Sequence, residues 1–297
     1  MNHAASILAA TDLSAPARHA AGRAARVAHE AGRALTLMHV LPADPIDSLR
    51  RWLGDAAVAD VERQSLRQLN MLAAGLRQQE GPHVPVEVLC ASGNVLDEIG
   101  RAADARDSAL LVLGARGEGF LRHLVPGTTS ERLLRRTTRP VLLVRQAAHA
   151  NYQSVLCAVD FSPWSIHAVA AARATAPRAR LLLFHAWQVP FEEKLRFAGV
   201  DAGTFAQYRC HTRAEAARQL QTLAESAGLQ PGGWAPCVVE GDPSQCLVEQ
   251  EQRHDCDLVV LGKHGRSAAE DLLLGSVTRH VLAEGSADVL VSTRHAA

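Results

Sequence analysis

The sequence predicts an α/β fold made of two tandem copies of one parallel-sheet domain. Its 297 residues fit two domains of ordinary size. The second half repeats the first at a constant shift. Within each half, short apolar runs alternate with longer amphipathic stretches, which is typical of strand–helix–strand crossovers. Such crossovers are right-handed and produce a parallel sheet that helices cover on both faces.

The internal repeat keeps one shift over five separate blocks. Asp12 has its counterpart in Asp160 and Gly114 in Gly262, each 148 residues further along the chain. The other blocks agree at the same shift: Ser92-Gly93-Asn94 with Glu240-Gly241-Asp242, Gly127-Thr128 with Gly275-Ser276, and residues 141–144 with 289–292. This agreement indicates a duplication. We expect one domain over residues 1–147 and a second over residues 151–297.

The strands are expected at short runs that are rich in aliphatic and β-branched residues. These runs are residues 5–10, 34–41, 84–90, 109–113 and 141–144, then 154–159, 180–186, 234–240, 258–261 and 289–292. Helices are expected between them, at residues 15–31, 55–79, 95–105 and 128–136, then 163–176, 204–227, 243–252 and 276–283. In such sheets a ligand binds beyond the carboxyl ends of the strands, where the strand order reverses. The loops that follow strands are therefore the expected place of function.

Composition argues against several classes of protein. The 31 basic and 31 acidic residues give no net charge, which disfavours a general nucleic-acid binder. No apolar run approaches the roughly 20 residues that a membrane span needs, and residues 1–30 lack a signal-peptide pattern. The six cysteines include no CxxC pair, so neither a zinc site nor a disulfide framework is indicated. We expect a cytoplasmic protein with neither nucleic acid nor membrane as partner.

The loop after the fourth strand of each copy combines glycines with hydroxyl residues. Gly-x-x-Gly is followed, after nine residues, by a third glycine and a hydroxyl residue at an expected helix start. Glycine lets a ligand approach the backbone closely, and the N–H groups at a helix start favour phosphate. The motif residues are Gly114, Gly117, Gly127, Thr128, Thr129 and Ser130 in the first copy, and Gly262, Gly265, Gly275, Ser276, Val277 and Thr278 in the second.

A structural interpretation of this loop stays open beside the functional one. Thr128 with Glu131 fits a capping box, and Ser276 fits a plain N-cap. The two copies nevertheless keep the same spacing although the nine intervening residues differ almost completely, EGFLRHLVP against RSAAEDLLL. This favours a phosphate-binding loop, to which Arg116 in the first copy, or Lys263 and Arg266 in the second, could add positive charge.

The end of the first strand gives a second signal in each copy. Asp12 and Asp160 each follow an apolar strand, and a carboxylate there can accept hydrogen bonds from a ribose. Helix capping by the same aspartates is the alternative. The second strand ends at Val40 in the first copy and Ala186 in the second, where a small apolar side chain can lie against a purine ring. The preceding histidines have no metal-binding spacing and are expected in the core or at a cap.

Common catalytic motifs are absent from the sequence. We find no GxxxxGK[ST], no GxGxxG after the first strand, no GxSxG and no HExxH. The sequence therefore indicates no catalytic residue and no metal ligand. An enzyme would need a base near the phosphates, for which His264 and Asp160 are the candidates.

These motifs resemble the ATP-binding members of the universal stress protein family, in its tandem two-domain form. The family pattern G-2x-G-9x-G-[ST] is matched in both copies, and so is the aspartate that ends the first strand. The resemblance implies two Rossmann-like domains of the adenine nucleotide alpha hydrolase type. Each would hold a five-stranded parallel sheet of order 3-2-1-4-5 with helices on both faces. It also implies an intramolecular pseudo-dimer through the last strands, and further homodimers are conceivable.

The resemblance also assigns a ligand and residue roles. ATP is the implied nucleotide, and a triphosphate calls for a divalent metal such as Mg²⁺ alongside it. Asp12 and Asp160 would contact the ribose and adenine region, Val40 and Ala186 would line the adenine pocket, and the loop residues would hold phosphates.

Two departures from the family pattern distinguish the copies. Thr128-Thr129 stands for the more usual Ser-Val in the first copy, and Ala186 stands for valine in the second. Judged by its phosphate motif, the second copy is expected to bind nucleotide better. Judged by its adenine-packing residue, the first copy is. The resulting hypothesis is an ATP-binding regulator of a stress response with at most slow hydrolysis. The alternatives are an ATPase or adenylyl-transferring enzyme on the same fold, and a scaffold that needs no nucleotide.

Overall fold

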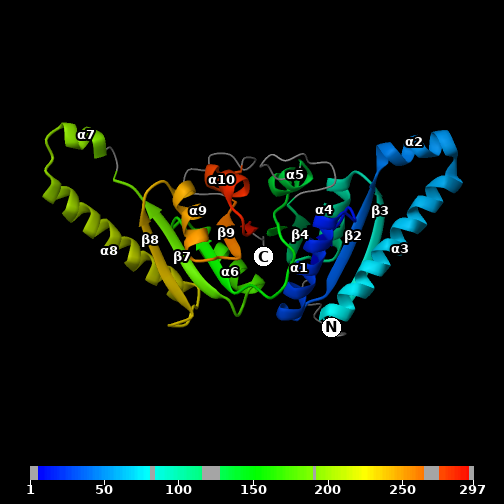
Figure 1. Ribbon diagram of the computed structural model, residues 1–297, viewed down its shortest axis with the longest axis horizontal. Helices are drawn as coiled ribbons and strands as arrows, with labels where there is room; N and C mark the ends of the chain where they lie inside the picture. The colour runs from blue at the N-terminus through cyan, green and yellow to red at the C-terminus, as the bar shows by residue number, and fades with distance from the viewer. Residues whose placement is uncertain (1–5, 81–83, 116–127, 190–191, 264–273, 294–297) are drawn as a thin grey trace.

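One continuous sheet runs through the whole molecule (Figure 1). The computed structural model describes residues 6–80, 84–115, 128–189, 192–263 and 274–293. Over these residues ten strands form a sheet of order β3-β2-β1-β4-β5-β10-β9-β6-β7-β8. Each half therefore has the strand order 3-2-1-4-5, and the predicted α/β fold of two tandem Rossmann-like halves is confirmed.

The strands have the following bounds. The first half holds β1 (Ile7–Ala10), β2 (Leu35–Pro42), β3 (Val86–Gly93), β4 (Leu110–Gly114) and β5 (Val141–Val144). The second half holds β6 (Ser154–Ala158), β7 (Arg180–Trp187), β8 (Trp234–Glu240), β9 (Leu258–Gly262) and β10 (Asp288–Ser292). The pairs within each half are parallel, whereas β5 and β10 pair antiparallel and join the halves.

Helices cover both faces of this sheet. In the first half they are α1 (Ala15–Ala31), α2 (Ala43–Leu53), α3 (Asp55–Glu80), α4 (Val95–Ala105) and α5 (Thr128–Arg136). In the second half they are α6 (Ser165–Thr175), α7 (Glu192–Phe197), α8 (Ala202–Ser226), α9 (Pro243–Arg253) and α10 (Ser276–Glu284). The α2–α3 and α7–α8 pairs lie at opposite ends of the molecule, and α5 and α10 lie near its centre (Figure 1).

The core divides into one apolar cluster on each face of the sheet. Ile7 and Ala9 of β1 belong to one cluster and Leu8 to the other, as the alternation of side chains along a strand requires. Alanines on α1, among them Ala20 and Ala24, are fully buried against the first cluster. Small side chains let this helix lie close to the sheet, so the loop before it is held firmly at the end of β1.

Two short helices were not expected from the sequence, α2 and α7. Residues 42–53 contain two prolines, which favour a loop. Pro45, however, lies in the first turn of α2, where proline is tolerated. Ile46 is buried with Leu41 and Val58 in a small apolar cluster. Tertiary packing therefore selects the helix where local preference does not.

Candidate functional site

The predicted site residues of the first half lie side by side at the carboxyl edge of the sheet. Ala10 pairs with Met38, and Asp12 and Val40 each lie two residues further along their chains. On the other side of β1, Ala9 pairs with Val112, two residues before Gly114. The strand order reverses between β2 and β4, with β1 between them. Such a reversal opens a ligand crevice between the loops in parallel α/β sheets.

The second half repeats this arrangement. Ala158 pairs with Phe184, so Asp160 and Ala186 lie two residues beyond a paired position. Cys157 pairs with Val260, two residues before Gly262. The sequence therefore brings the end of the first strand, the end of the second and the start of the glycine loop together in both halves.

The loop after β1 has an unusual backbone in both halves. Leu13 has φ 67° and its counterpart Phe161 has φ 59°, although neither is glycine. A left-handed conformation costs an L-residue roughly 1–2 kcal/mol. Such residues persist where the surroundings impose them, and they concentrate at ligand sites. Because the left-handed residue recurs in both halves, the turn around each aspartate is a regular part of the fold.

The aspartate carboxylates are fixed by hydrogen bonds. Oδ1 of Asp12 accepts from the Ser14 amide at 3.0 Å and from Ser14 Oγ at 2.5 Å. Oδ1 of Asp160 accepts from the Ser162 amide at 3.0 Å and from Ser165 Oγ at 3.0 Å. Ser14 itself caps α1 by accepting from the amide of Ala17. In the first half, therefore, the serine caps the helix and the aspartate orients the serine.

Two histidines that the sequence predicted to lie in the core or at a cap are half-buried and hold these loops. Nδ1 of His39 lies 2.8 Å from the carbonyl oxygen of Thr11, and Nδ1 of His185 lies 2.9 Å from that of Val159. A carbonyl oxygen only accepts, so Nδ1 is the donor in each case. Each accepting residue directly precedes a motif aspartate. The signal available in the sequence was a histidine at the same strand end in both copies.

The two positions predicted to line an adenine pocket pack on one face of the sheet. Val40 is buried in the same apolar cluster as Met38 and Leu113. Ala186 is half-buried and packs against that cluster from the second half. Both therefore present an apolar surface at the carboxyl edge, beside the aspartate loop.

The start of α10 carries no side-chain cap among the described residues. Gly275 occupies the N-cap position with φ −58° and ψ 154°, and Ser276 is exposed. The first N–H groups of a helix have no partner within it, which suits a phosphate. At the start of α5, Thr129 is exposed and buried Ser130 donates to the carbonyl of Gly114 at 3.2 Å. That bond ties the helix start to the end of β4.

Several motif residues lie outside the described residues. These are Gly117, Gly127 and Gly265, together with the candidate base His264 and the basic residues Arg116 and Arg266. The backbone of Thr128 begins α5, and its side chain is outside the description. Val277 is half-buried and Thr278 is buried in the first turn of α10.

Lys263, which the sequence suggested as a positive charge for the phosphate loop, contacts the other half of the molecule. Its side chain is buried, and Nζ donates to the carbonyls of Arg135 at 3.0 Å and Thr137 at 3.1 Å. These carbonyls belong to the end of α5 in the first half. The contact depends on the β5–β10 pairing, so no local pattern announces it.

Comparison with known proteins decides the family. The sequence model of the universal stress protein family matches residues 4–145 and 151–293. The chain belongs to the universal stress protein family. It is 30% identical over 308 residues to a universal stress protein of Mycolicibacterium smegmatis, with 96% of each chain covered. It is 29% identical over 194 residues to universal stress protein Rv2005c of Mycobacterium tuberculosis, with 63% of each covered.

Solved structures agree on the fold of this universal stress protein. The crystal structure of a universal stress protein from Archaeoglobus fulgidus matches with a TM-score of 0.70 at 16% identity, covering 98% of each chain. A putative universal stress protein from Pseudomonas aeruginosa matches with a TM-score of 0.62 at 21% identity, covering 97% of this chain and 92% of that one. At these identities the likeness concerns the fold, including the tandem arrangement of the halves.

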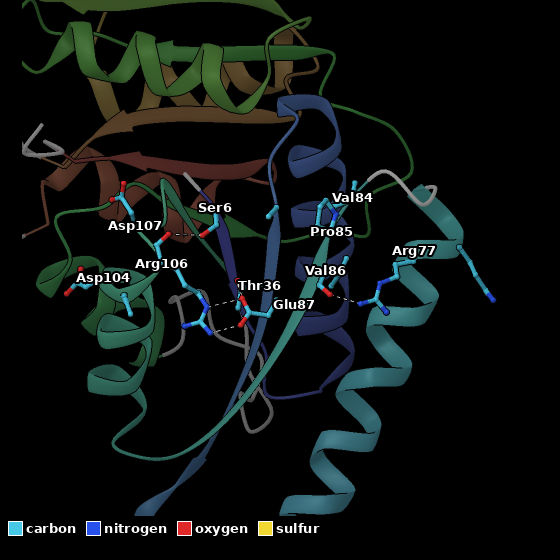
Figure 2. A pocket seen from close by; sticks show the side chains of 13 residues that line it. Ser6, Thr36, Arg77, Val84, Pro85, Val86, Glu87, Asp104, Arg106 and Asp107 are labelled. Atoms are coloured by element: carbon cyan, nitrogen blue, oxygen red, sulfur yellow. Dashed lines mark hydrogen bonds and ion pairs between the residues drawn. The ribbon is translucent and has the colours of Figure 1, made fainter. Parts of the chain in front are cut away.

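A cavity of about 1020 Å³ lies elsewhere in this universal stress protein. Figure 2 shows its lining, which includes Arg106 and Glu87 facing one another and Arg77 reaching from α3 to the Val86 carbonyl. Arg106 donates to Glu87 at 2.7 Å, and this hydrogen bond lowers the pKa of the Glu87 carboxyl. Ser6 and Thr36 place the cavity near the amino ends of β1 and β2. It therefore lies at the edge opposite the predicted nucleotide site.

The described ranges hold neither a membrane-spanning helix nor a metal-binding cluster. No helix there is long and apolar enough to cross a membrane. No group of three or more histidine, cysteine, aspartate or glutamate side chains is arranged there to hold a metal ion.

Proposed function

We propose that this universal stress protein binds ATP, one nucleotide in each half, and that occupancy regulates a stress response. The observation that carries the proposal is the set of loops that meet twice at the strand-order reversal. In each half it combines an oriented aspartate, an apolar strand end and a helix start after a glycine loop. We assign the two nucleotide domains to residues 1–147 and 151–297.

The residues present fit an adenine nucleotide. Asp12 and Asp160 would accept hydrogen bonds from the ribose, since their Oδ1 atoms are fixed beside left-handed turns. Val40 and Ala186 would lie against the adenine ring. Phosphates would lie at the helix starts, held by Gly114, Gly117, Gly127, Thr128, Thr129 and Ser130, and by Gly262, Gly265, Gly275, Ser276, Val277 and Thr278.

The open start of α10 supports the phosphate assignment. A Cβ added at Gly275 would meet only Thr278 Oγ1, at 3.9 Å. The glycine is therefore not needed for packing within the described structure. Its φ of −58° is also open to any residue. A role in admitting a ligand explains a glycine at this position.

The same geometry supports binding with at most slow hydrolysis. Fast hydrolysis needs a base that orients water toward the γ-phosphate. The Oδ1 atoms of Asp12 and Asp160 already accept from serine groups of their own loops. We expect turnover well below the roughly 1 s⁻¹ of an ordinary enzyme.

The thiols support a reducing, cytoplasmic location. All six cysteines are free. Burial raises the pKa of the Cys157 thiol to about 12, which makes it inert toward oxidants. The cytoplasmic assignment is part of this proposal.

The test is to identify and then titrate the nucleotide. The protein is purified without added nucleotide and denatured, and the released molecules are identified by mass spectrometry. Calorimetry with ATP and Mg²⁺ then counts the sites in the wild type, in Gly275→Asp and in the isosteric control Gly275→Asn. We expect one nucleotide per half in the wild type and the loss of the second-half site in Gly275→Asp only. Equal binding by the wild type and Gly275→Asp would overturn the phosphate assignment.

A further inference from the structure

The helix that begins at each proposed phosphate site ends against the other half of the molecule. α5 begins at Thr128 in the first half and is nine residues long. Its last carbonyls accept hydrogen bonds from Lys263 of the second half, at 3.0 Å from Arg135 and 3.1 Å from Thr137. Lys263 is only 8% exposed, so water screens this contact little.

The reciprocal contact exists at the end of α10. Arg145, which directly follows β5 of the first half, donates through Nη2 to the carbonyls of Val281 at 3.0 Å and Leu282 at 2.8 Å. Through Nη1 it donates to the carbonyl of Gly285 at 2.5 Å. Its backbone is anchored too, because the Arg145 amide donates to Asp288 Oδ1 at 2.8 Å. Each of the two helices therefore has a cation from the opposite half at its carboxyl end.

The two caps are not copies of one another. By the repeat shift, Lys263 corresponds to Ala115 and Arg145 corresponds to Thr293. Thr293 donates to the carbonyl of Thr138, just past α5, while Ala115 is buried. Lys263 and Arg145 thus do not correspond in the repeat, yet each donates to carbonyls at the end of a helix of the opposite half. A duplication alone does not produce this arrangement.

A cation at the carboxyl end of a short helix acts on both ends of that helix. It compensates the negative end of the helix dipole and satisfies carbonyls that lack partners. Because nine helical residues extend only about 14 Å, fixing the carboxyl end also fixes where the first N–H groups point. Those N–H groups are the ones proposed to hold phosphate.

We propose that Lys263 is a positioning residue for the nucleotide site of the first half, and that Arg145 is one for the site of the second half. This rests on the nucleotide sites proposed above. Each site is then completed by the half of the chain that does not bind its nucleotide. Lys263 adjoins Gly262 of the second-half motif, yet its effect falls on the first-half site.

The test measures each site separately in the full chain. Gly275→Asp disables the second site, and Thr129→Asp disables the first by placing a carboxylate in the exposed first turn of α5. In each background, ATP affinity is measured by calorimetry with and without Lys263→Met, which removes the charge and keeps the bulk. We expect Lys263→Met to weaken the first site about 5- to 10-fold and to leave the second within about 2-fold. Arg145→Met is expected to show the opposite pattern.

Adenosine provides the readout that separates positioning from general damage. Adenosine has no phosphate, so its affinity for the first site should not change in Lys263→Met. Equal losses for ATP and adenosine would mean a damaged fold and would overturn the proposal. A loss confined to the second site would mean that Lys263 contacts phosphate directly, which also overturns it. If the wild type binds no ATP, the proposed function fails and this inference fails with it. If the wild type binds ATP and Lys263→Met leaves the first site unchanged, this inference alone fails.

Discussion

The histidines at the ends of β2 and β7 bind the peptide that precedes each motif aspartate. Thr11 is buried, its amide donates to the Met38 carbonyl at 2.8 Å, and its carbonyl accepts from His39 at 2.8 Å. The residue before Asp12 is thus held to β2 on both sides. This hold on Thr11 helps to fix the position of the Asp12 carboxylate that follows it.

This contact predicts the effect of replacing His39. Phenylalanine fills a similar space in His39→Phe but donates no hydrogen bond, so the buried Thr11 carbonyl loses its donor. We expect the free energy of unfolding to fall by about 1–3 kcal/mol and ATP to bind more weakly to the first half. Urea denaturation measures the former. His19→Phe, on the exposed side of α1, is the control and should stay within about 0.5 kcal/mol of wild type.

At the residue scale the sequence predicted which candidate residues lie together, but not the contacts that hold them. Asp12, Val40 and Gly114 could be placed because each follows a recognisable strand. The left-handed backbone at Leu13 could not be foreseen, because nothing in a leucine favours that conformation. The direction of Lys263 could not be foreseen either, because it depends on residues 126 and 128 positions away in the chain.

At the scale of the element, the start of α10 has a glycine where a stronger N-cap residue could stand. Its N-cap is Gly275, and no side chain of the described residues caps it. Aspartate is among the best N-cap residues and also compensates the positive end of the helix dipole. The N-cap that would stabilise the helix most is therefore one that excludes an anion.

Gly275→Asp should consequently make the nucleotide-free protein more stable. It should also remove the further stabilisation that ATP gives at the second site. We expect the free energy of unfolding without nucleotide to rise by about 0.5–1 kcal/mol. The further stabilisation by saturating ATP at the second site should vanish. Thermal melting with and without ATP measures both effects. Gly275→Ala serves as the control, because it adds a Cβ without adding a cap or a charge. A variant that is less stable without nucleotide would contradict this view of the N-cap.

The strands and long helices were predictable because their apolar residues follow the period of the element. α2 and α7 were not, because α2 is held by the apolar packing of Ile46 and α7 by charged contacts with α8. Glu192 of α7 pairs with Arg209 of α8 at 2.8 Å, and Phe205 of α8 is buried with Trp187 and Val189. These partners are distant enough in sequence that no window of local preference contains them. Short helices at the ends of a sheet are therefore the elements most easily missed.

At the scale of the whole molecule, the β5–β10 pair turns two five-stranded sheets into one. Leu142 pairs with Leu290, both fully buried, in antiparallel register. Each half would otherwise expose an apolar edge strand, which is a site for aggregation. The pseudo-dimer that the family resemblance implied has this physical reason. It also brings the ends of α5 and α10 against the opposite half.

A buried polar cluster accompanies this junction. Asp288 of β10 is only 3% exposed. It accepts from Tyr152 Oη at 2.7 Å and lies 3.2 Å from Arg23 Nε of α1. Arg23 also lies over the Tyr152 ring, 3.9 Å from its centroid. The cluster therefore links α1 of the first half to the last strand of the second.

The ionisation of Asp288 makes this junction sensitive to pH. Burial raises the pKa of the Asp288 carboxyl, although hydrogen bonds from the Arg145 amide and Tyr152 and the charge of Arg23 oppose the shift. A carboxyl whose pKa is raised on folding binds its proton more tightly in the folded state. Its contribution to stability is therefore complete below the ordinary pKa of about 4 and falls as pH rises through the raised value.

Asp288→Asn tests both the pairing and the sign of this dependence. Asparagine replaces one acceptor oxygen of this carboxyl by an NH2 group, so one buried donor of the cluster loses its partner and we expect a loss of about 1–3 kcal/mol at neutral pH. The stability advantage of wild type over the variant should be larger near pH 4 than near pH 7. Other carboxyls titrate in both proteins and cancel in this difference. Urea denaturation at the two pH values provides the measurement. An advantage that grows with pH would mean that Arg23 outweighs desolvation at this carboxyl and that the junction is strongest with Asp288 ionised.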